Sequence, residues 1–108
     1  MEAISVRNDG NGILLTITGE ATIADAKRMR EEFLSHLRVR HIALDLSGVT
    51  DADTTFLEII NAFRLSVTAA GGSLTITALS ASVQELMRTC GYRLPSGRTT
   101  IAPAYRAA

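Results

Sequence analysis

The order of short apolar runs and longer periodic stretches most constrains how this chain can fold. Residues 13–18, 41–46 and 74–78 are short runs rich in aliphatic and β-branched side chains, which predicts strands. In the stretches that follow them, apolar residues recur every three or four positions, which predicts amphipathic helices. Strands that alternate with helices imply a largely parallel sheet with helices packed on it.

An antiparallel piece precedes this alternation. Residues 3–7 alternate weakly, and residues 8–12 read Asn-Asp-Gly-Asn-Gly, a cluster that tolerates positive φ and favours a turn. Two strands around such a turn predict a β-hairpin. The predicted fold is therefore α/β, with a mixed sheet of about four or five strands, an opening hairpin and about three helices. A last edge strand is expected near residues 99–101.

The helix boundaries follow from residues that suit helix ends. Thr22 with Asp25 resembles a capping box for the first helix, and Ser82 with Glu85 resembles one for the third. The second helix is expected to begin at Asp53, after a loop at residues 47–52. Glycines at 71–72 and 91 suit the left-handed conformation that ends a helix. The predicted buried faces are Ala26, Met29, Phe33 and Leu37; Phe56, Ile60, Phe63, Val67 and Ala70; and Val83, Leu86, Met87 and Cys90.

Size and composition limit the possible classes of protein. A chain of 108 residues predicts one domain spanning 1–108, and 46% hydrophobic residues can form a core without metal or disulfide. Eleven basic and eleven acidic residues cancel, which argues against nucleic-acid binding. The single cysteine fits a reducing compartment. Without a signal-like run or a membrane-length apolar stretch, we expect a cytoplasmic protein with no direct membrane contact.

The segment 44–57 is the best candidate for a functional site. It leaves a central strand and enters a helix at Asp53-Thr54-Thr55, and α/β folds place sites where parallel strands end. A helix N-terminus favours an anion, so a hydroxyl there suits phosphorylation. A phosphate would add roughly two negative charges beside Asp51 and Asp53, and thereby change any docking surface.

Simpler interpretations of the same residues remain open. Thr54 or Thr55 could serve simply as the helix cap, without being phosphorylated, and Asp53 is an equally good cap. Asp45 and Asp51, with Asp53, could suggest a metal or a carboxylate pair, but strand-end, turn and cap positions explain them. No metal-ligand spacing, nucleophile set or phosphate-binding loop is visible, so we expect no metal, no cofactor and no enzymatic activity.

Four segments together resemble the STAS domain signature. They are residues 45–49 (Asp-Leu-Ser-Gly-Val), 53–57 (Asp-Thr-Thr-Phe-Leu), 17–20 (Ile-Thr-Gly-Glu) and 69–74 (Ala-Ala-Gly-Gly-Ser-Leu). The chain is similar to the anti-sigma-factor antagonists of that family over nearly its whole length. This resemblance implies a STAS-type mixed sheet and a non-catalytic regulatory protein, either a monomer or a weak homodimer.

The resemblance also implies a phosphorylation-controlled partner switch. The phospho-acceptor position matches Thr54, with Thr55 as second choice, and the partner surface would comprise Thr22, Asp53, Thr54, Thr55 and Phe56. The partner would be an anti-sigma-factor kinase, a kinase linked to a two-component or chemotaxis system, or another signalling protein, and the kinase would supply ATP. The alternative is a constitutive STAS adaptor, for example in a lipid ABC transporter, without phosphorylation.

Two residues depart from the antagonist pattern. Phe56 stands where the family has Gly, and it would obstruct a partner unless its ring turns into the core. Thr22 stands where antagonists often carry Asp, and the Thr22-Ile23 pair looks more like STAS proteins that accompany chemotaxis systems.

Overall fold

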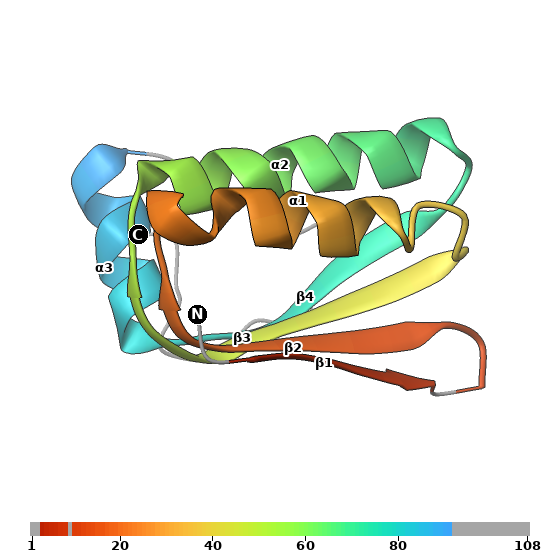
Figure 1. Ribbon diagram of the computed structural model, residues 1–108, viewed down its shortest axis with the longest axis horizontal. Coiled ribbons are helices and arrows are strands. Elements are labelled where there is room, and N and C mark those ends of the chain that lie inside the picture. Colours follow the sequence, from red (N-terminus) through yellow and green to blue (C-terminus); the bar gives the residue numbers. More distant parts are fainter. Residues whose placement is uncertain (1–2, 9, 92–108) are drawn as a thin grey trace.

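The computed structural model describes residues 3–8 and 10–91 (Figure 1). Four strands and three helices follow one another in the predicted order, and a short 3₁₀ turn at Ile23–Asp25 precedes the first helix. The strands are β1 (Ala3–Asn8), β2 (Ile13–Ala21), β3 (His41–Ala52) and β4 (Ser73–Leu79); the helices are α1 (Ala26–Leu34), α2 (Thr54–Ala69) and α3 (Ala81–Cys90). The strand expected at residues 99–101 lies outside the described residues.

The four strands form one mixed sheet in the order β1-β2-β3-β4. β1 and β2 pair antiparallel, with Val6 opposite Leu15, which confirms the predicted hairpin. The β2–β3 and β3–β4 pairs are parallel, with Leu44 opposite both Leu15 and Ile76. The mixed α/β fold predicted from the alternating pattern is therefore correct.

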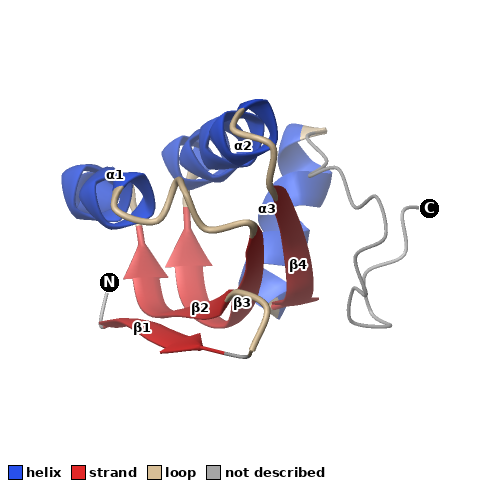
Figure 2. Ribbon diagram, turned by 90° about the vertical axis from the view of Figure 1, so that its right-hand side faces the viewer, coloured by secondary structure: helices blue, strands red, loops and turns tan. Residues whose placement is uncertain are grey.

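One face of the sheet carries the main core. α1 and α2 lie side by side over this face and run in the same direction, while α3 lies at the end of the sheet where β2 and β3 terminate (Figures 1 and 2). Alternate residues of β2 point into the core, as the period of two along a strand requires. The core is mainly aliphatic, and the rings of Phe33 and Phe63 stack at 4.3 Å between α1 and α2.

β3 is longer than predicted. Residues 47–52 were expected to form a loop, but the strand continues to Ala52 because β2 extends beside it. Thr18 pairs with Gly48 between two register shifts, and a Cβ at Gly48 would lie only 2.8 Å from Thr18 Cγ2. The glycine thus allows a close approach of two strands, and it does not mark a loop.

The helix ends agree with the prediction in part. Gly71 and Gly91 have φ of 90° and 65°, which confirms both stops. Ser80, and not Ser82, caps α3: its side chain accepts the Val83 N–H at 3.2 Å. Ser82 instead donates its hydroxyl to the Thr50 carbonyl at 2.7 Å, and so ties α3 to β3.

Four predicted inward positions are less buried than expected. Cys90 and Ala70 are exposed, because each lies at the last turn or cap of its helix, beyond the sheet. Leu37 packs against the core but is only half-buried, because α1 ends three residues earlier at Leu34. Leu86, in the middle of α3, also packs against the core but is only half-buried. The prediction of fully buried faces was therefore wrong at these four positions and right at the others.

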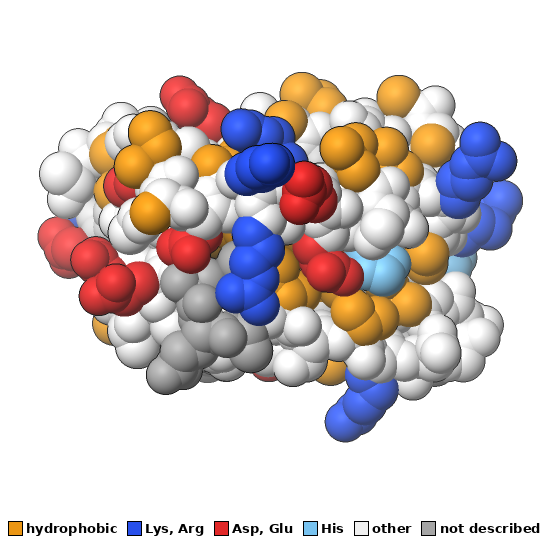
Figure 3. Space-filling view, viewed as in Figure 1, with side chains coloured by type: hydrophobic (Ala, Val, Ile, Leu, Met, Phe, Trp, Pro, Cys, Tyr) orange, Lys and Arg blue, Asp and Glu red, His pale blue; other side chains and the backbone are white. Residues whose placement is uncertain are grey.

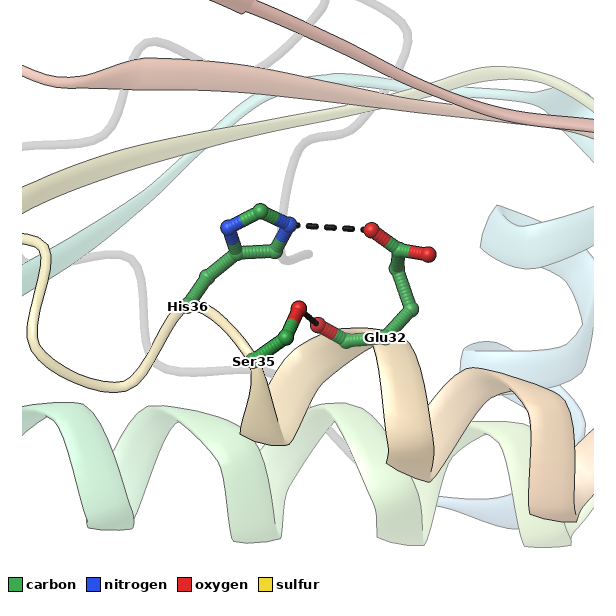
Figure 4. A network of polar contacts seen from close by, with 3 residues as sticks. All are labelled: Glu32, Ser35 and His36. Atoms are coloured by element: carbon green, nitrogen blue, oxygen red, sulfur yellow. Dashed lines mark hydrogen bonds and ion pairs between the residues drawn. The ribbon is translucent and has the colours of Figure 1, made fainter.

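Polar contacts stabilise the exit from α1. His36 and Glu32 point toward each other, with 2.9 Å between Nε2 and Oε2 (Figure 4). The Ser35 hydroxyl donates to the Glu32 carbonyl at 2.6 Å. The Ser35 bond occupies a backbone carbonyl in the last turn of the helix, where carbonyl groups lack N–H partners further along the helix. None of the helices in residues 3–8 and 10–91 is long and apolar enough to cross a bilayer.

Candidate functional site: the start of helix α2

The candidate site lies where β2 and β3 end. From this edge the chain enters α1 through the turn at residues 22–25, and enters α2 at Asp53 (Figure 1). Because β2 and β3 are parallel neighbours, the two helix starts are brought together although about thirty residues separate them in the sequence. The fold therefore places Thr22 close to the Asp53-Thr54-Thr55 segment.

Asp53 joins the two helix starts through its carboxylate. One oxygen, Oδ1, accepts the Phe56 N–H at 3.2 Å and so caps α2. The other, Oδ2, accepts the Ile23 N–H at 2.8 Å, across thirty positions of sequence. A single side chain thereby satisfies one free donor of α2 and fixes the turn before α1.

Thr54 is the first residue of α2, and its side chain is exposed. Thr55 follows and is half-buried. Neither hydroxyl forms a hydrogen bond with any residue that the structure describes. The capping group is therefore Asp53, and the interpretation of Thr54 or Thr55 as the cap is wrong. The Thr54 hydroxyl is left accessible at a helix N-terminus, where free N–H groups favour an anion.

Phe56 does not reach the surface. Its side chain is 0% exposed and is the largest fully buried side chain in the described part of the chain. The ring turns into the core, and only its backbone N–H contributes to the site, as the donor to Asp53. The side chain expected at the partner surface is therefore absent from it, and it does not obstruct an approaching molecule.

Ile23 was missed by the sequence analysis as a site residue. Its side chain is 69% exposed, although it is a large aliphatic group, and its N–H is bound to Asp53. Thr22 beside it is half-buried, and its N–H donates to Asp25 Oδ2 at 3.2 Å. The sequence signal that could have identified Ile23 was its position outside the apolar stripe of α1. We call the surface formed by Thr22, Ile23, Asp53 and Thr54 the switch surface.

Carboxylates surround the switch surface. Glu20 on β2 and Asp51 on β3 lie opposite each other in the strand register, and both are exposed (acidic side chains near this end are red in Figure 3). Asp45 accepts two hydrogen bonds from Ser47, whose N–H and hydroxyl donate to Asp45 Oδ1 at 2.9 and 2.6 Å. Within residues 3–8 and 10–91, no three metal-binding side chains come together. A phosphate on Thr54 would therefore enter an already acidic region.

The family of the chain follows from comparison with known proteins. The family model described as "Mlab, STAS domain" matches residues 4–93, and the chain therefore belongs to the STAS family. No curated protein sequence matches it significantly.

Solved structures show the same fold. An anti-sigma-factor antagonist from Mycobacterium paratuberculosis matches with a TM-score of 0.75 at 14% identity, over 94% of this chain and 85% of that one. The antagonist SpoIIAA in its unphosphorylated form matches with a TM-score of 0.69 at 13% identity, over 82% of this chain and 81% of SpoIIAA. A longer protein, Mglu, has a TM-score of 0.61 at 18% identity, over 67% of this chain but only 18% of Mglu. At these identities the likeness establishes the fold alone.

Proposed function

We propose that this chain is a non-catalytic regulatory STAS protein whose partner binding is switched by phosphorylation of Thr54. The observation that carries the proposal is the division of roles at the start of α2. Asp53 caps the helix, so the exposed Thr54 hydroxyl has no hydrogen bond to a described residue that a kinase would have to break. The partner is a kinase that also acts as an anti-sigma factor, or a kinase of a two-component or chemotaxis system.

Phosphorylation would alter the switch surface in two ways. It would add roughly two negative charges to a region that already contains Asp51 and Asp53. It would also place those charges beside the Asp53 carboxylate, which holds the Ile23 N–H at 2.8 Å. Repulsion between the two anions weakens that bond and frees the exposed Ile23 side chain from its position. A partner that docks on Ile23 and Thr54 would then dissociate.

Two structures of the related fold support the proposed chemistry. SpoIIAA has been solved in an unphosphorylated and a phosphorylated form, and both have this fold. In the proposed switch, the kinase supplies ATP, and this chain needs neither cofactor nor metal. We place it in the cytoplasm as a single STAS domain, where such a kinase would meet it.

The test is a pull-down from the native host with wild type, Thr54→Ala and Thr54→Asp, followed by intact-mass measurement. We expect a kinase partner, an added phosphate on wild type only, and loss of the partner with Thr54→Asp. Thr55→Ala is the matched control and should keep both the partner and the phosphate. Thr54→Ala should match wild type in unfolding free energy, so lost phosphate would not reflect misfolding.

A second candidate function is a constitutive STAS adaptor, for example in a lipid ABC transporter. It is favoured by the matching family model, whose description names Mlab and not an antagonist. Equal retention of one partner by wild type, Thr54→Ala and Thr54→Asp, with no added mass, would refute the phosphorylation switch and support the adaptor.

A further inference from the structure

A second surface, separate from the switch surface, lies between α1 and α2. The two helices enclose a groove of about 340 Å³. Phe33 and Ile59 line it, and Leu34 and Ala62 border it. Leu34, the last residue of α1, is a large aliphatic side chain that is 64% exposed beside this groove. Figure 3 shows hydrophobic side chains over these helices, with charged groups of both signs beside them.

The groove is lined by one positively charged and one negatively charged side chain. Arg30 from α1 and Glu58 from α2 line it, both are exposed, and neither forms an ion pair with a described residue. A surface that offers one cation and one anion on opposite sides is complementary to itself. It would suit a second copy of the chain that is turned over upon it.

The levels of these residues along the helices support such a match. Phe33 and Phe63 stack at 4.3 Å, so they mark the same level on α1 and α2. With a rise of about 1.5 Å per residue, Arg30 and Glu58 both lie toward the helix starts, within roughly 3 Å of one level. Leu34 and Ala62 lie one residue to either side of the stacked rings, also within roughly 3 Å of one level.

We propose that this groove is a self-association surface that joins two copies of the chain. A two-fold axis along the groove places α1 of one copy over α2 of the other, in parallel. Arg30 then faces Glu58 of the second copy, and the large Leu34 faces the small Ala62, each contact occurring twice. The formal net charge of zero means that no long-range repulsion opposes the association.

The dimer should be weak, because two helix faces bury less area than a stable protein interface needs. We expect a dissociation constant between about 10 μM and 1 mM. The inference does not rest on phosphorylation of Thr54, since none of the paired residues belongs to the switch surface. Thr54→Ala should therefore dimerise like wild type, whatever the outcome of the pull-down.

Sedimentation equilibrium of the full chain, up to about 1 mM, tests the proposal through a charge swap. Arg30→Glu and Glu58→Arg should each weaken the dimer roughly tenfold or more, because each creates two like-charge contacts. The double variant Arg30→Glu/Glu58→Arg should recover the wild-type constant, because the opposite pairs form again. Arg7→Glu, an equal charge change on β1, is the matched control and should have no effect.

Three results would overturn the proposal. The first is a wild type that stays monomeric at every concentration. The second is a dimer that is indifferent to the single charge reversals. The third is a double variant as weak as the single ones, which would mean that Arg30 does not face Glu58 of the second copy. Because Arg7, Arg30 and Glu58 are all exposed, circular dichroism should confirm an unchanged fold in each variant.

Discussion

Removing the Asp53 side chain tests how the two helix starts are held together. Asp53→Ala deletes the cap of α2 and the acceptor of the Ile23 N–H. Loss of an N-cap acceptor costs about 1 kcal/mol. The second bond is short and charge-assisted but lies in a solvent-exposed region, so we assign it about 1 kcal/mol as well. The expected loss in free energy of unfolding is therefore about 2 kcal/mol.

Asp53→Asn separates the two contributions. An asparagine oxygen can still accept the Phe56 N–H, and Asn caps helices about as well as Asp. Its amide group would then face the Ile23 N–H, and two donors cannot bond. The expected loss for this variant is about 1 kcal/mol, half that of Asp53→Ala.

Urea unfolding followed by circular dichroism measures both variants against wild type. In thermal unfolding, Asp53→Ala should lower Tm by roughly 8–16 °C, because 1 kcal/mol corresponds to about 4–8 °C in a domain of this size. A loss below about 0.5 kcal/mol for Asp53→Ala would refute the proposed double role, since changes of that size are typical of surface positions without any specific contact. Equal losses in free energy of unfolding for Asp53→Ala and Asp53→Asn would refute only the assignment of Asp53 as the cap of α2.

Two further substitutions test the packing and the cap assignment. Phe56→Ala should cost about 3–5 kcal/mol in urea unfolding, because it empties a fully buried site of the core; a cost below about 1 kcal/mol would mean that the ring does not occupy the core. Ser80→Ala should cost about 1 kcal/mol through loss of the α3 cap. Ser82→Ala removes only a half-exposed bond to the Thr50 carbonyl and should cost less; the reverse order of losses would restore Ser82 as the cap.

The sequence determines the elements of this fold better than their limits. The hairpin was predictable because a turn cluster separates two runs of strand-forming residues. Residues 47–52 were misassigned because Ser47 and Gly48 favour a loop locally, whereas pairing with β2 keeps the segment extended. Such pairing depends on residues about thirty positions away, and no local pattern reports it.

The site was predictable in position but not in detail. Asp53, Thr54 and Thr55 are all good capping residues, so the sequence could not identify which one caps α2. The structure selects Asp53, since its extended backbone lets Oδ1 reach the Phe56 N–H. Ile23 escaped notice because its exposure results from the 3₁₀ turn before α1, which rotates it out of the stripe of that helix.

The residue that departs most from the antagonist pattern also explains why Thr54 is accessible. With 3.6 residues per turn, Thr54 and Phe56 point to opposite sides of α2. Burial of Phe56 and Leu57, at 0% and 2% exposure, fixes the rotation of the first turn, and thereby directs Thr54 to solvent. A glycine at position 56 would remove one of the two buried side chains that fix this rotation and leave it to Leu57 and the Asp53 cap. In this chain the large side chain therefore leaves the Thr54 hydroxyl uncovered, and the surface exposed at this helix start is formed by Thr54 and Ile23.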